Sequence, residues 1–168
     1  MKSKTRTLVI IAILSVILFV QEQVLNFLPN INLTIFLLVL YSKKLGFKMT
    51  SAIIFIYCLL DNIIMGSFNI TYFPFMLIGW LLVPLFVCII FKDINDEKRL
   101  ALLGAGLSFL YCWVFIIPGI LIMKIGFLSY LVSDIPFELL LALSSFLSIL
   151  LLYKPCSSLF DHYILKQG

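Results

Sequence analysis

Four of the eight acidic side chains stand in or beside long apolar stretches, which is a costly place for a carboxylate. They are Glu22, Asp61, Asp134 and Glu138. A charge within hydrocarbon costs about 2.5–3.5 kcal/mol on insertion scales, so such residues commonly serve a ligand or a transport path. Gln21 and Gln23 flank Glu22, and amides add hydrogen-bonding capacity to the carboxylate. The chemistry that these residues offer is recognition of a polar ligand by charge and hydrogen bonds.

The spacing of these residues predicts polar stripes on helices. One stripe has members separated by four, seven and three residues, which share one face of an α-helix: Asp134, Glu138, Ser145 and Ser148. In another apolar stretch Tyr57 lies four residues before Asp61, and Cys58 lies four before Asn62. With Glu22 in the first stretch, three predicted helices carry polar groups toward the same side.

The connections between apolar stretches add amide, hydroxyl and aromatic groups. Small-molecule sites combine an apolar, aromatic lining with a few placed polar groups, and Trp80 could stack on a planar ring. We therefore predict a pocket open to the outer side of the membrane. The candidate substrate-binding residues are Glu22, Asn26, Asn30, Asp61, Asn62, Asn69, Tyr72, Trp80, Lys124 and Glu138.

Plainer explanations of these residues remain open. Trp and Tyr side chains near helix ends often anchor a protein at the membrane interface. Lys124 could extend its stem to the outer interface. Asp134 could cap a helix that has Pro136 in its first turn. Glu22 and Asp61 could make purely structural contacts between helices.

Motifs for catalysis, ATP binding and metal binding are absent from the sequence. It has no GxxxxGK[ST] loop, no HExxH and no GxSxG, and its single histidine, His162, stands beside Asp161 in the predicted C-terminal tail, where we expect a solvated pair. The four cysteines form no CxxC pair, which favours packing over metal or redox roles. We therefore predict that the protein is not an enzyme and uses no cofactor or metal ion.

The composition excludes a soluble fold. Hydrophobic residues make up 63% of the 168 residues and charged residues 12%, whereas soluble domains average roughly 45–50% and 25%. Lipid must therefore be the solvent for much of the surface. The net charge of +4 is carried by short segments between apolar runs, so it indicates topology and not nucleic-acid binding. The first apolar run has no A-x-A cleavage site after it, so we interpret it as an uncleaved helix.

Polar, proline and glycine residues divide the chain into six apolar segments, which predict a single all-α bundle of six transmembrane helices over residues 1–168. The segments are 8–27, 31–41, 49–65, 75–91, 100–123 and 135–153. A spanning helix needs about 20 residues, and the second segment would cover only about 17 Å. Irregular backbone at membrane depth requires shielding by protein or a water-filled cavity. The short second segment is thus a further sign of a cavity.

The basic residues predict the orientation. Eleven of the twelve lie before the first segment, between the second and third, between the fourth and fifth, or after the sixth: Lys2, Lys4, Arg6, Lys43, Lys44, Lys48, Lys92, Lys98, Arg99, Lys154 and Lys166. Only Lys124 lies on the opposite side. Because basic loops stay in the cytoplasm, both ends of the chain are predicted to be cytoplasmic, which six spans allow.

Several local stretches point to a known family. They are LPNINL at 28–33, KLGFK at 44–48, LDN at 60–62, IGW at 78–80, DIPF at 134–137 and LLYKP at 151–155. With the size, the six predicted helices, the cytoplasmic ends and the order of segments, the chain resembles the substrate-binding S components of energy-coupling factor (ECF) vitamin transporters. The resemblance covers nearly the whole chain. It departs from the family in the first helix, where the AxxxA packing pattern is replaced by Ala12 and Val16.

The resemblance implies a function in a bacterial cell membrane. An S component binds a vitamin or related micronutrient at its outer face, beneath the loops after the first and third helices. It then docks on a transmembrane subunit driven by two ATPase subunits, which carry the ATP chemistry. The alternative from a different class is a small non-transporting membrane scaffold, similar to the MreD-like cell-shape proteins.

Overall fold

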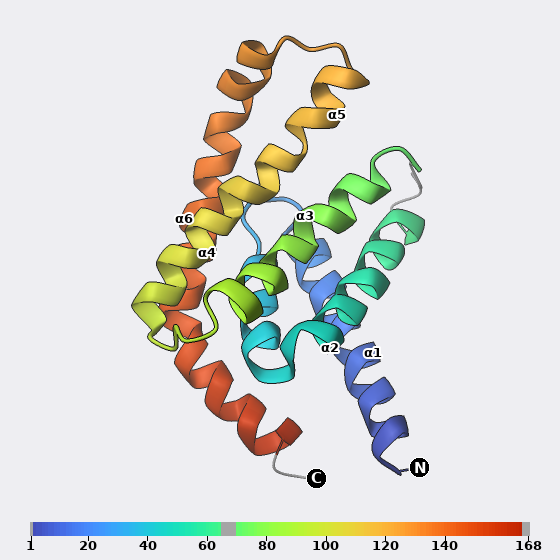
Figure 1. Cartoon of the computed structure of the whole chain (residues 1–168), viewed down its shortest axis with the longest axis vertical. Helices are drawn as coiled ribbons and strands as arrows, with labels where there is room; N and C mark the ends of the chain where they lie inside the picture. Colours follow the sequence, from blue (N-terminus) through green and yellow to red (C-terminus); the bar gives the residue numbers. More distant parts are fainter. Residues whose placement is uncertain (1, 65–69, 166–168) are drawn as a thin grey trace.

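The computed structural model describes residues 2–64 and 70–165, and every regular element in these ranges is a helix (Figure 1). The elements are α1 (Lys2–Leu25), α2 (Thr34–Ile64), α3 (Phe73–Leu85), the π-helical η1 (Phe86–Ile90), α4 (Glu97–Val114), α5 (Ile116–Leu121), α6 (Phe127–Phe160) and the π-helical η2 (Asp161–Leu165). Within the described ranges, five stretches are long and apolar enough to cross a bilayer: Lys4–Leu25, Thr34–Ile64, Phe73–Ile90, Glu97–Leu121 and Phe127–Phe160. For the described residues, the prediction of an all-helical chain with helices apolar enough to cross a membrane is confirmed.

Gly46 interrupts the long helix α2. Its backbone has φ 77° and ψ 177°, a conformation that essentially only glycine adopts, while the chain is helical over 34–45 and 47–64. Figure 1 shows the two halves of α2 running in different directions from this point. The sequence predicted two segments, 31–41 and 49–65, joined by a basic loop. That expectation is corrected, because the helix reaches Gly46 from both sides and includes the lysines of the expected loop.

Prolines explain two irregularities in the spanning helices. The predicted segment 100–123 is divided at Phe115, because Pro118 has no N–H to donate to the carbonyl of Val114, where α4 ends. In α3, Pro84 likewise removes a helical donor, and the π-helical η1 begins at Phe86. The stretch Phe73–Ile90 nevertheless remains long enough to span.

The last long helix differs most from its predicted bounds. It begins at Phe127 and ends at Phe160, whereas 135–153 was expected. Asp134 is therefore an interior residue of α6 and does not cap it; Gly126 occupies the N-cap position. The expectation was misled by Pro136, which lies inside α6. Membrane helices tolerate interior prolines when neighbouring groups satisfy the freed backbone carbonyl.

The helices pack by close approach of small residues and by buried hydroxyl contacts. A Cβ added at Gly104 of α4 would lie 2.2 Å from Cδ1 of Ile149 in α6, so the glycine permits tight packing of these two helices. The hydroxyls of Ser108 in α4 and Ser145 in α6 lie 3.0 Å apart. In contrast, α1 exposes large apolar side chains such as Leu8 and Ile13 on the lateral surface of the bundle, as expected where lipid is the solvent.

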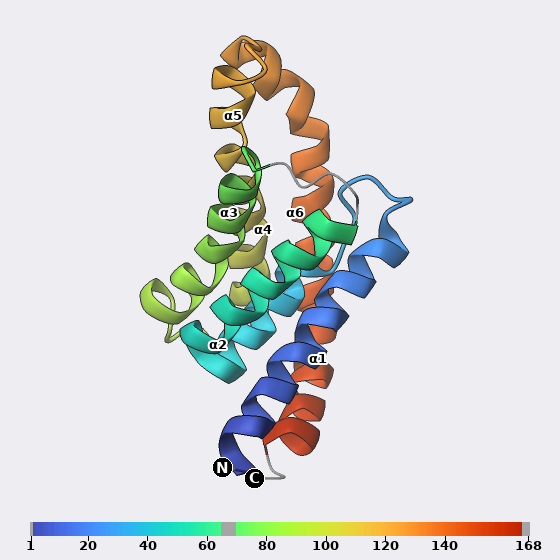
Figure 2. The ribbon, with the colours of Figure 1, turned by 90° about the vertical axis from the view of Figure 1, so that its right-hand side faces the viewer.

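Contacts between distant segments bring the basic stretches to one end of the bundle. They are the hydrogen bond from Arg6 to the carbonyl of Ile164 (2.6 Å), the ion pair Lys44–Asp161 (2.6 Å), the hydrogen bonds from Lys43 to the carbonyls of Phe91 (3.1 Å) and Lys92 (2.9 Å), and the ion pair Lys154–Glu97 (2.6 Å). Figure 2 shows the beginning of α1 and the end of α6 side by side. We call this region, formed by residues 4–6, 43–48, 91–99 and 153–164, the basic end. Asp161 is thus bound to Lys44, a partner that the sequence did not predict.

Candidate functional site

Glu22 and Asp61 lie far from the basic end and at similar depth. At 1.5 Å per residue, Glu22 is about 24 Å beyond Arg6 along α1. Asp61 is about 22 Å beyond Gly46 along the second half of α2. Both side chains are half-buried, so neither carboxylate is freely exposed. The two acids therefore share one level of the bundle, toward the end opposite the basic end.

Two hydrogen bonds join α1 to α2 at this level. The hydroxyl of Tyr57 donates to Oε2 of Glu22, and Nε2 of Gln23 donates to Oδ1 of Asp61 at 3.4 Å. Tyr57 is completely buried, and its position four residues before Asp61 turns both side chains toward α1. The structure thus brings together the predicted residues Glu22 and Asp61. We call Glu22, Gln23, Tyr57 and Asp61 the acidic cluster.

Asn62 extends the polar contacts from α2 to α3. Its Nδ2 donates to the carbonyl of Cys58 at 2.9 Å and lies 3.3 Å from Sδ of Met76. The amide is therefore held by the protein in this conformation. Its predicted neighbour Asp61 keeps one carboxylate oxygen, Oδ2, outside the bond to Gln23.

Trp80 of α3 lies next to the acidic cluster inside a group of aromatic rings. Its ring stacks on Tyr111 of α4, with centroids 3.8 Å apart and planes 22° apart, and meets the ring of Tyr57 edge-on at 6.2 Å. Trp80 is 1% exposed, so the ring face expected to stack on a ligand is occupied by Tyr111. Its Nε1 has no hydrogen-bond partner among the described residues. A buried donor without a partner is costly, so this nitrogen marks a place where a polar ligand or a water would be stabilised.

Gln21 closes the connection between α1 and α2 over this end. Its Oε1 accepts a hydrogen bond from the backbone N–H of Leu33 at 2.8 Å, and its Nε2 donates to the hydroxyl of Thr34 at 2.8 Å. Thr34 is fully buried at the start of α2. The segment 26–33 is thereby tied to α1 although it contains no helix. This satisfies the backbone N–H of Leu33 in the irregular entry to α2, which the sequence had indicated.

Glu138 belongs to a second polar group, between α4 and α6. It is 3% exposed, and its Oε1 has no hydrogen-bond partner in the described part of the chain. Asn30 reaches the same part of α6, because its Nδ2 donates to the carbonyl of Phe137 at 3.2 Å. Ser145 lies two turns further along α6, on the same stripe that the spacing predicted, and meets Ser108. Asn30 therefore contacts the backbone of the residue directly before Glu138.

The remaining candidate residues that the structure describes lie in connections, outside the acidic cluster and the polar group at Glu138. Asn26 and Lys124 are exposed in connections, and Lys124 adopts a left-handed backbone conformation with φ 54°. Tyr72 is half-buried directly before α3, and its hydroxyl has no partner among the residues that the structure describes. Asn69 lies outside the described residues.

The chemical groups of this site are suited to ligand recognition by charge and hydrogen bonds. Across residues 2–64 and 70–165 there is no group of three or more His, Cys, Asp or Glu side chains that could hold a metal ion. What the helices bring to one level is a pair of carboxylates, amides and phenol or indole groups in apolar surroundings. Such a set recognises a ligand that offers hydrogen-bond donors or positive charge.

Sequence reasoning left three important residues out of the candidate set. Tyr57 was signalled by its spacing from Asp61, and Gln21 by its place beside Glu22. Tyr111 had no signal, because only the packing of α3 on α4 brings its ring to Trp80.

No protein-family model matches the chain, and no curated protein and no solved structure matches it either.

Proposed function

We propose that this protein is the substrate-capture subunit, or S component, of an ECF-type transporter in a bacterial cell membrane. In this proposal the two halves of α2 are separate membrane segments, so that the chain has six segments and both ends in the cytoplasm. A pocket toward the outer face holds a vitamin or related micronutrient. A transmembrane subunit and two ATPase subunits supply the energy for release inside.

The hydrogen bond from Tyr57 to Glu22 is the observation that carries the proposal. A carboxylate held by a fully buried phenol, about 24 Å from the basic end, is costly to keep within a membrane helix. Intramembrane ionisable groups commonly mark ligand or ion sites. Asp61 lies at the same level with one carboxylate oxygen outside the bond to Gln23.

The distribution of charge supports the orientation. The basic end carries Arg6, Lys43, Lys44 and Lys154 in contact with other segments, whereas the acidic cluster lies far along α1 and α2. Basic segments remain in the cytoplasm during insertion, so the acidic cluster would open toward the outside. The absence of a P-loop from the sequence fits a subunit whose ATP chemistry is in its partners.

Ligand binding by the purified protein tests the proposal. The protein in detergent micelles is titrated with a panel of water-soluble vitamins and their precursors by calorimetry. We expect one compound to bind tightly. Glu22→Gln and Asp61→Asn should each weaken its binding by about tenfold or more, the loss of one charge-assisted hydrogen bond. Asp93→Asn is the matched control, because it removes an exposed carboxylate at the basic end and should leave binding unchanged.

Association with partners is the second arm of the test. The tagged protein, expressed in its native host, should co-purify with one further membrane protein and two ATPases. Binding of no compound together with recovery of no ATPase refutes the proposal. Altered cell shape with normal vitamin uptake after deletion would instead support a membrane scaffold.

A further inference from the structure

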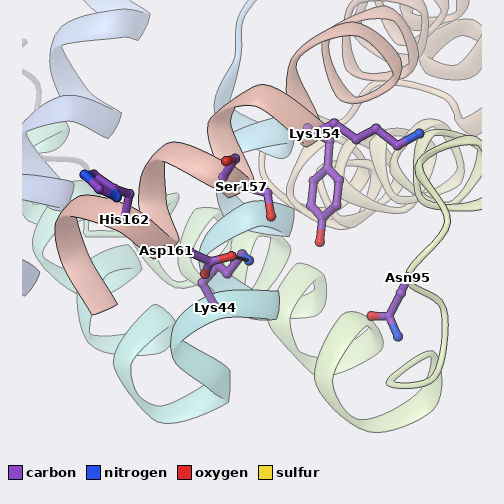
Figure 3. A pocket seen from close by; sticks show the side chains of 8 residues that line it. Lys44, Asn95, Lys154, Ser157, Asp161 and His162 are labelled. Carbon is purple, nitrogen blue, oxygen red and sulfur yellow. Dashed lines mark hydrogen bonds and ion pairs between the residues drawn. The ribbon is translucent and has the colours of Figure 1, made fainter. Parts of the chain in front are cut away.

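A polar cavity lies at the basic end, away from all ten predicted substrate residues. It is bounded by the first half of α2, the connection between η1 and α4, and the last part of α6 with η2 (Figure 3). Its volume is about 850 Å³, within the range of small-molecule sites. Residues that line it and matter to its chemistry are Lys44, Asn95, Tyr153, Lys154, Ser157 and Asp161.

The charged groups of this cavity are arranged so that its acid is neutralised and donors remain. Asp161 is paired with Lys44 at 2.6 Å, and each ammonium carries three donors, so Lys44 keeps donors beyond that pair. Lys154 is paired at 2.6 Å with Glu97 of α4, its side chain is 73% exposed, and it also lines the cavity, so its ammonium keeps donors beyond the pair with Glu97. Figure 3 shows Lys44 and Asp161 together on one side of the cavity and Asn95 on the side of the connection.

Hydroxyl and amide groups complete the lining. Tyr153 and Ser157 both lie on α6, one helical turn apart, and Asn95 contributes an exposed amide from the opposite wall. Ammonium, hydroxyl and amide donors together are the groups that proteins use on phosphate oxygens. The imidazole of His162 also lines the cavity.

The position of the cavity indicates the depth in the membrane at which its ligand would lie. It lies where α2 turns at Gly46 and where the spans Phe73–Ile90 and Phe127–Phe160 end, which is the level of lipid headgroups if these stretches cross the bilayer. Basic pockets between helices at this level are typical binding sites for anionic lipid headgroups.

We propose that the cavity at the basic end binds a negatively charged phosphate group, carried by an anionic membrane lipid or by a soluble phosphate compound. Lys44 and Lys154 supply the ammonium donors that their ion pairs leave over, and Ser157 with Asn95 supplies neutral donors. This site is independent of the acidic cluster and of any substrate bound there.

Retention of lipid by the purified protein tests this proposal. The protein in neutral detergent is incubated with phosphatidylglycerol or phosphatidylcholine and examined by native mass spectrometry, with thermal unfolding as a second readout. Phosphatidylglycerol should be retained in preference to phosphatidylcholine, whose choline offsets the phosphate charge. Competition by millimolar inorganic phosphate would identify the soluble source, and retention of lipid in its presence would identify the membrane source.

Substitutions distinguish specific binding in this cavity from general electrostatic attraction to a basic surface. Lys154→Gln should weaken binding of the phosphate probe by about tenfold, the value of one charge-assisted hydrogen bond. Lys98→Gln, an exposed residue at the same end that does not line the cavity, has the same charge change and should have little effect. The double variant Lys44→Gln/Asp161→Asn keeps the net charge and should also weaken binding.

Two results would overturn the proposal. One is an equal loss for Lys98→Gln and Lys154→Gln, which would mean that binding depends on net charge alone. The other is the absence of binding by both phosphatidylglycerol and inorganic phosphate to the unaltered protein. If the double variant fails to fold, the exposed Lys154 and Lys98 still provide the comparison.

Discussion

The hydroxyl of Tyr57 donates a hydrogen bond to the carboxylate of Glu22, and this contact joins α2 to α1 within their membrane-spanning stretches. Tyr57 is fully buried and Glu22 half-buried, so water has little access to the pair. Hydrogen bonds to charged groups are worth more in such surroundings than in water. The contact therefore contributes to both the packing of α1 and the geometry of the acidic cluster.

Replacing this hydroxyl should destabilise the protein. Tyr57→Phe removes the donor and leaves the carboxylate of Glu22 without this partner, which should lower the free energy of unfolding by about 1–3 kcal/mol. Thermal unfolding in detergent measures the effect. Tyr72→Phe is the matched control, since the hydroxyl of Tyr72 is buried without a partner among the described residues, and its removal should leave the unfolding temperature unchanged or raise it. Equal effects of the two variants would contradict a role for the Tyr57–Glu22 contact in stability.

Gly46 should not tolerate a side chain although there is room for one. A Cβ added at this position would meet nothing within 4 Å, so Gly46→Ala tests the backbone conformation alone. Holding alanine at φ 77° and ψ 177° should cost about 1–3 kcal/mol. At Gly106, inside α4, an added Cβ also meets nothing, and alanine there should stabilise by up to about 1 kcal/mol. Chemical unfolding of the two variants in detergent would give opposite signs; a neutral Gly46→Ala would argue against the kink.

The contact between α4 and α6 at Gly104 should show a specific rescue. Gly104→Ala places a Cβ 2.2 Å from Cδ1 of the fully buried Ile149, so the isoleucine must shift. Overpacking of this kind costs about 1–3 kcal/mol. Ile149→Val removes that Cδ1 and by itself costs about 0.5–1.5 kcal/mol. The double variant should be more stable than the sum of the single effects predicts, as measured in a double-mutant cycle. Strict additivity would mean that the two residues do not meet.

Labelling of single cysteines should distinguish a five-span from a six-span topology. In a background without the four native cysteines, Lys48→Cys and Lys98→Cys should react with a membrane-impermeant maleimide only from the cytoplasmic side. Lys124→Cys should react only from outside. All three positions are exposed. If α2 crossed the bilayer as one continuous span, position 48 would lie within the hydrocarbon and remain unlabelled.

The pattern of the sequence was sufficient for the class of the protein. Long apolar runs with few charges require helices in lipid, because a membrane offers no water to satisfy an unpaired backbone. The spacing of Tyr57 and Asp61, and of Glu138 and Ser145, correctly placed each pair on one helix face, since helical periodicity is a local property. The sequence also identified Glu22 and Asp61 as polar residues within predicted apolar helices.

The ends of the helices and the contact partners of individual side chains could be determined only from the tertiary structure. Asp134 and Pro136 have the local pattern of a helix start, yet α6 begins at Phe127, because packing against neighbours can override a local signal. The stacking of Trp80 on Tyr111 depends on how α3 lies on α4, and no spacing along the chain encodes it. The same holds for the contact between Lys44 and Asp161.

Composition and periodicity alone thus determined an all-helical membrane protein in which four of the eight acids stand in or beside apolar stretches. The three-dimensional packing decided which polar groups meet: Glu22 with Tyr57, Gln23 with Asp61, and the side chains of the basic-end cavity. The physical reason is the distance along the chain over which each kind of interaction acts. Hydrophobic and helical patterns act over a few residues of one segment, whereas a site depends on the relative rotation of several helices, which is set by contacts such as that of Gly104 with Ile149.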